Sequence, residues 1–66
     1  MGDVMRNLLK QTGMTQAAAA DFLGVSSRTV RRWVGGDEVP RAVILLLSLM
    51  IRYDLKRYEI EYLVQL

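Results

Sequence analysis

Three arginines in one short segment are the residues of this sequence best suited to bind a charged partner. Arg28, Arg31 and Arg32 fall within residues 26–34, a stretch that contains no acidic residue. Guanidinium groups clustered on one element attract phosphate groups, because their positive charges add over a short distance. The same pattern is also typical of a helix face that meets only solvent. The charges alone therefore leave both interpretations open.

The remaining polar residues do not form a recognisable catalytic set. The chain has no His and no Cys, which excludes imidazole and thiol catalysis, disulfides and the usual zinc sites. Its seven acidic residues show no pattern of a paired catalytic pocket, and Gly35–Gly36 is not followed by the Lys-Ser or Lys-Thr of a phosphate-binding loop. We therefore expect a protein that is not an enzyme and that uses no metal, no cofactor and no small-molecule ligand.

The length of 66 residues predicts one small domain covering residues 1–66. A chain of this size buries only ~60% of the surface that it exposes when unfolded, and without disulfide or metal it often depends on a partner chain. No apolar run follows a basic start, so no secretory signal is expected. The longest apolar stretch, residues 42–51 with Ser48 inside it, is shorter than the ~20 residues of a membrane span. We expect a cytoplasmic protein with no membrane partner.

Glycines and a proline divide the chain into helical segments. Gly13, Gly24 and Gly35 each follow a segment with helical spacing, and Pro40 suits the first turn of the next helix. The predicted helices run from just after Asp3 to about residue 12, over residues 16–23, over a segment within 26–34, and over about 41–51. The predicted N-caps of the first three helices are Asp3, Thr15 and Ser26.

The third predicted helix has two different faces. Val30 and Trp33 are three residues apart and form an inward face, and a buried Trp can remove ~150–250 Å² from water. The outward face then carries Ser27, Arg28, Arg31 and Arg32. In the preceding segment, the alanines at 17–20 make a thin helix that a neighbour can approach closely.

The C-terminal third, residues 41–66, is predicted to supply a dimerisation surface. The helix at 41–51 is apolar almost all round, so one face can pack on the domain. The opposite face would be exposed to water unless another surface covered it, and such a patch is typical of an interface. The predicted interface residues are Val43, Leu46, Leu47, Met50, Tyr58 and Tyr62. The tail permits two structures: a helical stripe of Leu55, Tyr58, Tyr62 and Leu66, or strand-like alternation through residues 58–66 that could pair with a second copy. Asp54 as an N-cap favours the helix.

The segment 15–35 resembles the helix-turn-helix of the Cro/C1-type repressors, also called the XRE family. The residues that carry the resemblance are Gln16, Ala20, Leu23, Gly24, Val25, Val30, Trp33 and Gly35. The flanking helices extend it over roughly residues 5–50. The short length, with Val39–Pro40–Arg41–Ala42 leading into a Leu-rich helix, also resembles small phage-encoded regulators, of which autorepressors of anti-CRISPR operons are one group. Phe22 departs from the pattern, since many members have a polar residue there; we expect Phe22 to be a core contact rather than part of an interface.

The resemblance implies an all-α bundle of about five short helices that binds double-stranded DNA. The second helix of the helix-turn-helix would enter the major groove. The residues that correspond to base-reading positions are Ser27, Arg28 and Arg32, with Arg31 beside them. Gln16 matches a phosphate-binding glutamine, and Thr15, Ser26 and Arg41 would add contacts to the DNA backbone.

Two functions follow from these expectations. The first is a transcriptional repressor of the bacterial cytosol and nucleoid that binds a palindromic operator as a homodimer, with reading helices ~34 Å apart. The alternative is a protein-binding helix-turn-helix module, such as an antitoxin, that grips another protein through the apolar residues 43–50. The three-arginine face counts against the alternative, because a module that binds only protein does not need it.

Overall fold

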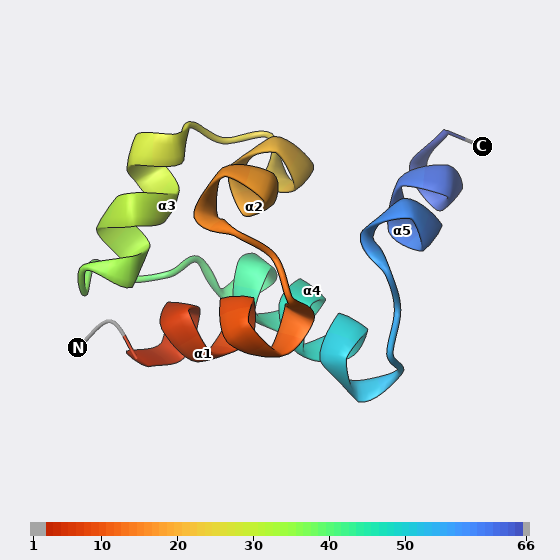
Figure 1. The fold of residues 1–66 in the computed structure, drawn as a ribbon, viewed down its shortest axis with the longest axis horizontal. Helices are drawn as coiled ribbons and strands as arrows, with labels where there is room; N and C mark the ends of the chain where they lie inside the picture. The colour runs from red at the N-terminus through yellow and green to blue at the C-terminus, as the bar shows by residue number, and fades with distance from the viewer. Residues whose placement is uncertain (1–2, 66) are drawn as a thin grey trace.

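Five α-helices make up the part of the chain that the computed structural model describes, residues 3–65 (Figure 1). They are α1 (Asp3–Thr12), α2 (Gln16–Leu23), α3 (Ser27–Val34), α4 (Arg41–Arg52) and α5 (Arg57–Val64). No strand occurs in this range, so the predicted all-α bundle of about five short helices is confirmed.

The helix boundaries follow from local chemistry. The side-chain oxygens of Thr15 and Ser26 accept hydrogen bonds from the backbone N–H groups of Ala18 (3.0 Å) and Thr29 (3.1 Å), which confirms both as N-caps. Gly24 ends α2 in the left-handed conformation, with φ of 73°. The prediction that Asp3 caps α1 is wrong, because Asp3 is itself in the first turn of the helix. Its carboxylate still lies at the positive end of the helix dipole.

The core forms where four of the helices meet. α2 packs on α3, and α1 packs on both α3 and α4, so that α2 and α3 lie above α1 and α4 in Figure 1. The small Ala19 and Ala20 are buried and allow α2 to lie close to its neighbours. The buried core residues are Met5, Leu8, Leu9, Ala19, Ala20, Val30, Trp33, Leu47 and Met50.

The packing of α4 corrects the predicted interface. Leu47 and Met50 are 0% and 3% exposed and belong to the core of the single chain, so their assignment to a dimer surface is wrong. Val43 and Leu46 are half-buried against the same core. The solvent-exposed stripe is instead formed by Leu45, Leu49 and Tyr53, which recur every four residues.

The tail forms a helix, so the helical alternative is the correct one. The prediction that Asp54 is its N-cap is wrong. Lys56, not Asp54, is the N-cap of α5, and its backbone N–H donates to Glu59 Oε1 at 2.7 Å. Asp54 has a φ of 52° and lies in the turn after α4. Tyr58 and Tyr62 are exposed on α5, whereas Leu66 of the predicted stripe lies outside the described residues.

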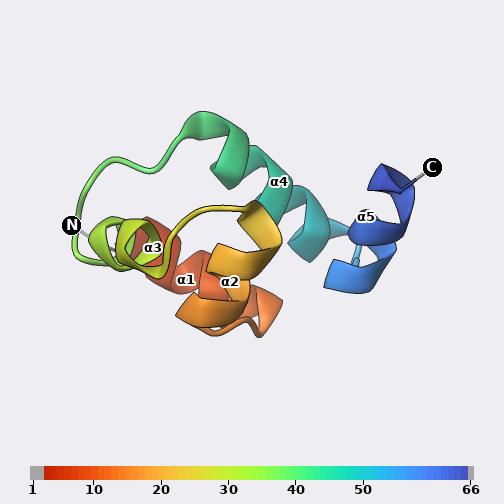
Figure 2. The same cartoon turned by 90° about the horizontal axis from the view of Figure 1, so that it is seen from above.

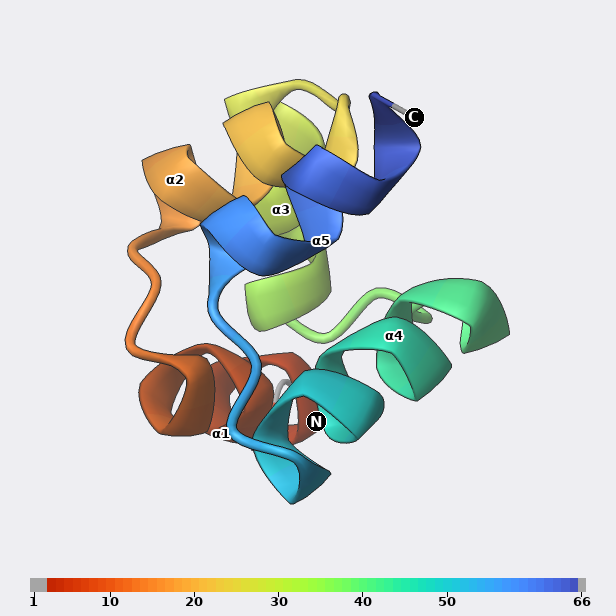
Figure 3. The ribbon, with the colours of Figure 1, turned by 90° about the vertical axis from the view of Figure 1, so that its right-hand side faces the viewer.

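One arginine of α5 attaches this helix to α2, and Figure 3 shows α5 in front of α2 and α3. Arg57 Nη1 donates to the Ala18 carbonyl at 3.1 Å, and Nη2 forms an ion pair with Asp21. The Arg57 guanidinium also lies 5.8 Å from the ring centroid of Phe22. Phe22 is half-buried against the core, as predicted. α5 buries none of its own residues fully, and Ile60 is half-buried against the core, so Arg57 adds polar contacts to a limited apolar packing.

Candidate nucleic-acid interface

The exposed face of α3 carries all four residues that the sequence predicted there. Ser27, Arg28, Arg31 and Arg32 are exposed, and at ~100° per residue they span about 140° of the helix circumference. The opposite side holds Val30, 0% exposed, and Trp33, 7% exposed. The two faces do not overlap, so core packing fixes the direction in which the arginines project.

The beginning of α3 is held in place by its cap. Ser26 Oγ accepts from the Thr29 N–H and also lies 2.9 Å from Thr29 Oγ1, in a hydrogen bond that either hydroxyl can donate. Both contacts occupy the Ser26 hydroxyl inside the protein, so its first role is structural. The Thr15 hydroxyl accepts from the Ala18 N–H and keeps its own proton for a further acceptor.

The three arginines of α3 differ in their surroundings. Arg32 Nε donates to Asp37 Oδ2 at 2.9 Å across the turn that follows the helix. Arg28 and Arg31 take part in none of the ion pairs formed among residues 3–65. The sequence showed Asp37 close behind the basic segment, but pairing needs the chain to turn back at Gly35–Gly36. The structure therefore separates one arginine that has a carboxylate partner from two that have none among residues 3–65.

The candidate contacts to a DNA backbone come from the beginnings of two other helices. Thr15 and Gln16 are exposed at the start of α2, the helix that packs on α3. Arg41 is exposed as the first residue of α4, after the loop that leaves α3. Thr15 and Gln16 thus share a layer with the arginine face, whereas Arg41 belongs to the layer of α1 and α4 (Figure 1).

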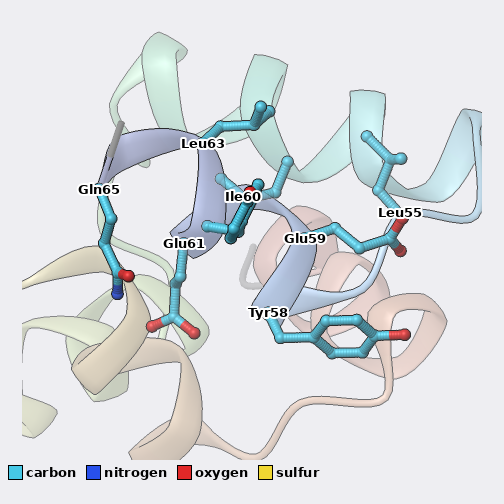
Figure 4. A pocket seen from close by; sticks show the side chains of 8 residues that line it. Leu55, Tyr58, Glu59, Ile60, Glu61, Leu63 and Gln65 are labelled. Carbon is cyan, nitrogen blue, oxygen red and sulfur yellow. The ribbon is translucent and has the colours of Figure 1, made fainter.

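A second surface feature lies away from α3. An open concavity runs along α5 and is shown close up in Figure 4. Leu55 and Leu63 lie on one side of it and Glu61 and Tyr58 on the other. α3 and α5 lie toward opposite ends of the long axis of the molecule (Figures 1 and 2). The arginine face and the apolar surface of the tail are therefore separate.

The part of the chain that the structure describes contains neither a metal-binding cluster nor a membrane-spanning helix. Among residues 3–65, no group of three or more His, Cys, Asp or Glu residues is placed to hold a metal ion. No helix in the same range has the length and apolar character needed to cross a membrane.

Comparison with known proteins gives one match. Residues 5–35, slightly less than half of the chain, match the family model of the homeodomain-like domain. This region covers most of α1 and all of α2 and α3, with the cap and the turn between them. The match supports a helix-turn-helix DNA-binding protein and does not distinguish the Cro/C1 type from other helix-turn-helix proteins. No curated protein and no solved structure matches the chain.

Proposed function

We propose that the chain is a sequence-specific regulator of transcription, of the Cro/C1 type, that represses by occupying an operator in double-stranded DNA. The observation that carries the proposal is the division of α3 into a packed apolar face and an exposed face with three arginines. An α-helix fits the major groove of B-DNA, which is about 12 Å wide. Repression follows from the exclusion of polymerase and requires no chemistry by the protein.

The arginines have distinct tasks in this proposal. Arg28 and Arg32 are one helical turn apart, so they can reach neighbouring base pairs in the same groove. A guanidinium donates two parallel hydrogen bonds to O6 and N7 of guanine, and each such contact contributes ~1–3 kcal/mol of discrimination. Ser27 and Arg31 lie on the same exposed face and complete it. We therefore expect guanine at the contacted positions of the operator.

Contacts to phosphates would fix the position of the protein on the duplex. Gln16 and Thr15 stand at the N-terminus of α2, where unpaired backbone N–H groups favour an anion. The Thr15 hydroxyl has a proton available for a phosphate oxygen. Arg41 would contribute from the start of α4, and Ser26 from the start of α3. These contacts supply affinity without sequence preference.

We further propose that the working form is a homodimer, in which a second copy covers the apolar surface of α4 and α5. Leu45, Leu49 and Tyr53 are 55%, 48% and 65% exposed. Tyr58 and Tyr62 add exposed aromatic surface on α5. A two-fold axis would relate the two α3 helices and make the operator palindromic, with half-sites one helical turn or a multiple of it apart. Such a regulator works in the bacterial cytosol or nucleoid, and a phage origin fits its size.

The test begins with selection of preferred sites from random duplexes, followed by binding titrations on the selected site. Arg28→Ala and Arg32→Ala should each reduce the preference for the selected site over a scrambled duplex by about five- to 150-fold, the equivalent of ~1–3 kcal/mol. The matched control is Arg52→Ala, an exposed arginine at the end of α4. Affinity should fall steeply with salt, as counterions are released from several phosphates. Full preference in both α3 variants would refute the assignment of the reading helix.

The second candidate function is a module that binds another protein, such as an antitoxin. The exposed stripe of Leu45, Leu49 and Tyr53 favours it, because a single chain leaves this apolar surface uncovered. Light scattering coupled to size exclusion separates the candidates, since a repressor should elute as a homodimer. A monomer that enriches no duplex from the random pool would support the protein-binding module instead.

A further inference from the structure

An acidic residue of the loop after α3 is joined to a base-reading arginine in two ways. Asp37 Oδ2 accepts from Arg32 Nε at 2.9 Å, and the Asp37 backbone N–H donates to the Arg32 carbonyl at 3.0 Å. Gly36, with a φ of 121°, takes a conformation that L side chains rarely adopt and turns the chain back on the helix. The backbone bond therefore places the carboxylate at the side of the guanidinium.

The pairing decides which donors of Arg32 stay available. A guanidinium has five N–H groups arranged around a plane, one on Nε and two on each Nη. Asp37 occupies the Nε donor, which leaves Nη donors at the outer end of the side chain. Two parallel donors at that end are what O6 and N7 of guanine accept. The carboxylate also opposes the charge of Arg32, which weakens its attraction for phosphate at any position along the duplex.

We propose that Asp37 is a positioning residue that makes Arg32 a reader of base edges rather than a binder of phosphate. Arg28 and Arg31, which have no carboxylate partner among the described residues, then supply more of the salt-dependent attraction. The inference rests on the proposed function and goes beyond it. It makes Asp37, outside α3 and of the same charge as DNA, a determinant of specificity.

The adjacent Glu38 offers a matched control. Glu38 and Asp37 line the same recess at the end of α3, together with Thr29, Arg32 and Trp33. Both residues are exposed, and no hydrogen bond or ion pair joins Glu38 to another of the described residues. Removal of either carboxylate changes the net charge by the same amount. Only removal of Asp37 releases Arg32.

The experiment compares Asp37→Ala and Glu38→Ala by titration of the selected site and a scrambled duplex over a range of salt concentrations. Asp37→Ala should lower the ratio of the two affinities at least five-fold and raise affinity for the scrambled duplex, with a steeper salt dependence. It should also relax the base preference at the position that Arg32→Ala relaxes. Glu38→Ala should strengthen both affinities alike and leave their ratio unchanged.

A double variant separates positioning from general charge. In an Arg32→Ala background, the effect of Asp37→Ala on the affinity ratio should disappear, because the residue that it positions is gone. Equal ratios for Asp37→Ala and Glu38→Ala would overturn the inference while leaving the proposed function intact, and so would an effect that persists without Arg32. A wild-type chain that binds no duplex would overturn the proposed function itself.

Discussion

The rotation of α4 about its axis can be tested by comparing two leucines of the same helix. Leu47 is fully buried and Leu45 is 55% exposed. Leu→Ala deletes three carbon atoms, and at about 0.8 kcal/mol for each buried CH₂ group the transfer cost at Leu47 is ~2.4 kcal/mol. A residual cavity adds to this, which gives an expected loss of ~2.5–4 kcal/mol. At Leu45, less than half of the side chain is covered, so the same change should cost at most about 1 kcal/mol.

The difference is large against the stability of so small a domain. A single core of this size supplies only about 3–5 kcal/mol, so Leu47→Ala should remove most of the free energy of unfolding. Urea denaturation measures this loss of unfolding free energy. The fluorescence of Trp33 is the probe, because it is the one Trp of the chain and is buried. Equal shifts of the midpoint for the two variants would refute the packing of α4 described above.

The same pair of variants reports on the proposed dimer. Loss of core packing at Leu47 should have the same cost at every protein concentration. A dimer contact at Leu45 should instead make the Leu45→Ala cost increase with concentration, because association stabilises the folded state by mass action. Titrations at protein concentrations a hundredfold apart distinguish the two. A Leu45→Ala effect that is small and constant would place the interface elsewhere or remove it.

Two further predictions concern the ends of α2 and α5. Gly24→Ala should lower the free energy of unfolding by about 1–2 kcal/mol, because the φ of 73° is left-handed and no atom lies within 4 Å of an added Cβ. Gly24→Asn should lower it by less, because Asn tolerates this conformation better. Thermal unfolding measures both variants, and equal costs would contradict a purely conformational origin. Arg57→Met should speed amide hydrogen exchange in α5 and leave exchange in α1 unchanged, because the contacts of Arg57 to Ala18 and Asp21 join α5 to α2. Arg52→Met is the control. Unchanged exchange in α5 of the Arg57→Met variant would show that apolar packing alone holds this helix.

The sequence determined the helix-turn-helix because its signals are local. Thr15, Ser26 and Gly24 act on backbone groups within a few residues, so their roles at the ends of helices follow from residue type and position alone. The orientation of α3 was also predictable. Its apolar residues, Val30 and Trp33, lie on one side and its arginines on the other, so only one rotation buries the first group and solvates the second.

The tertiary structure decided what the pattern left ambiguous. α4 is apolar on nearly every side, so its sequence gives no preference for the rotation that buries Leu47 and exposes Leu45; the surface of α1 against which it packs makes that choice. The pairing of Arg57 with Asp21 joins residues 36 positions apart and needs the bundle to be assembled first. The contact between Arg32 and Asp37 spans only five positions, yet it depends on the turn at Gly36. The sequence thus determined which residues α3 exposes. The folded chain decided which arginine of α3 is held by a carboxylate, because charge pairing depends on distances in space that spacing along the sequence does not specify.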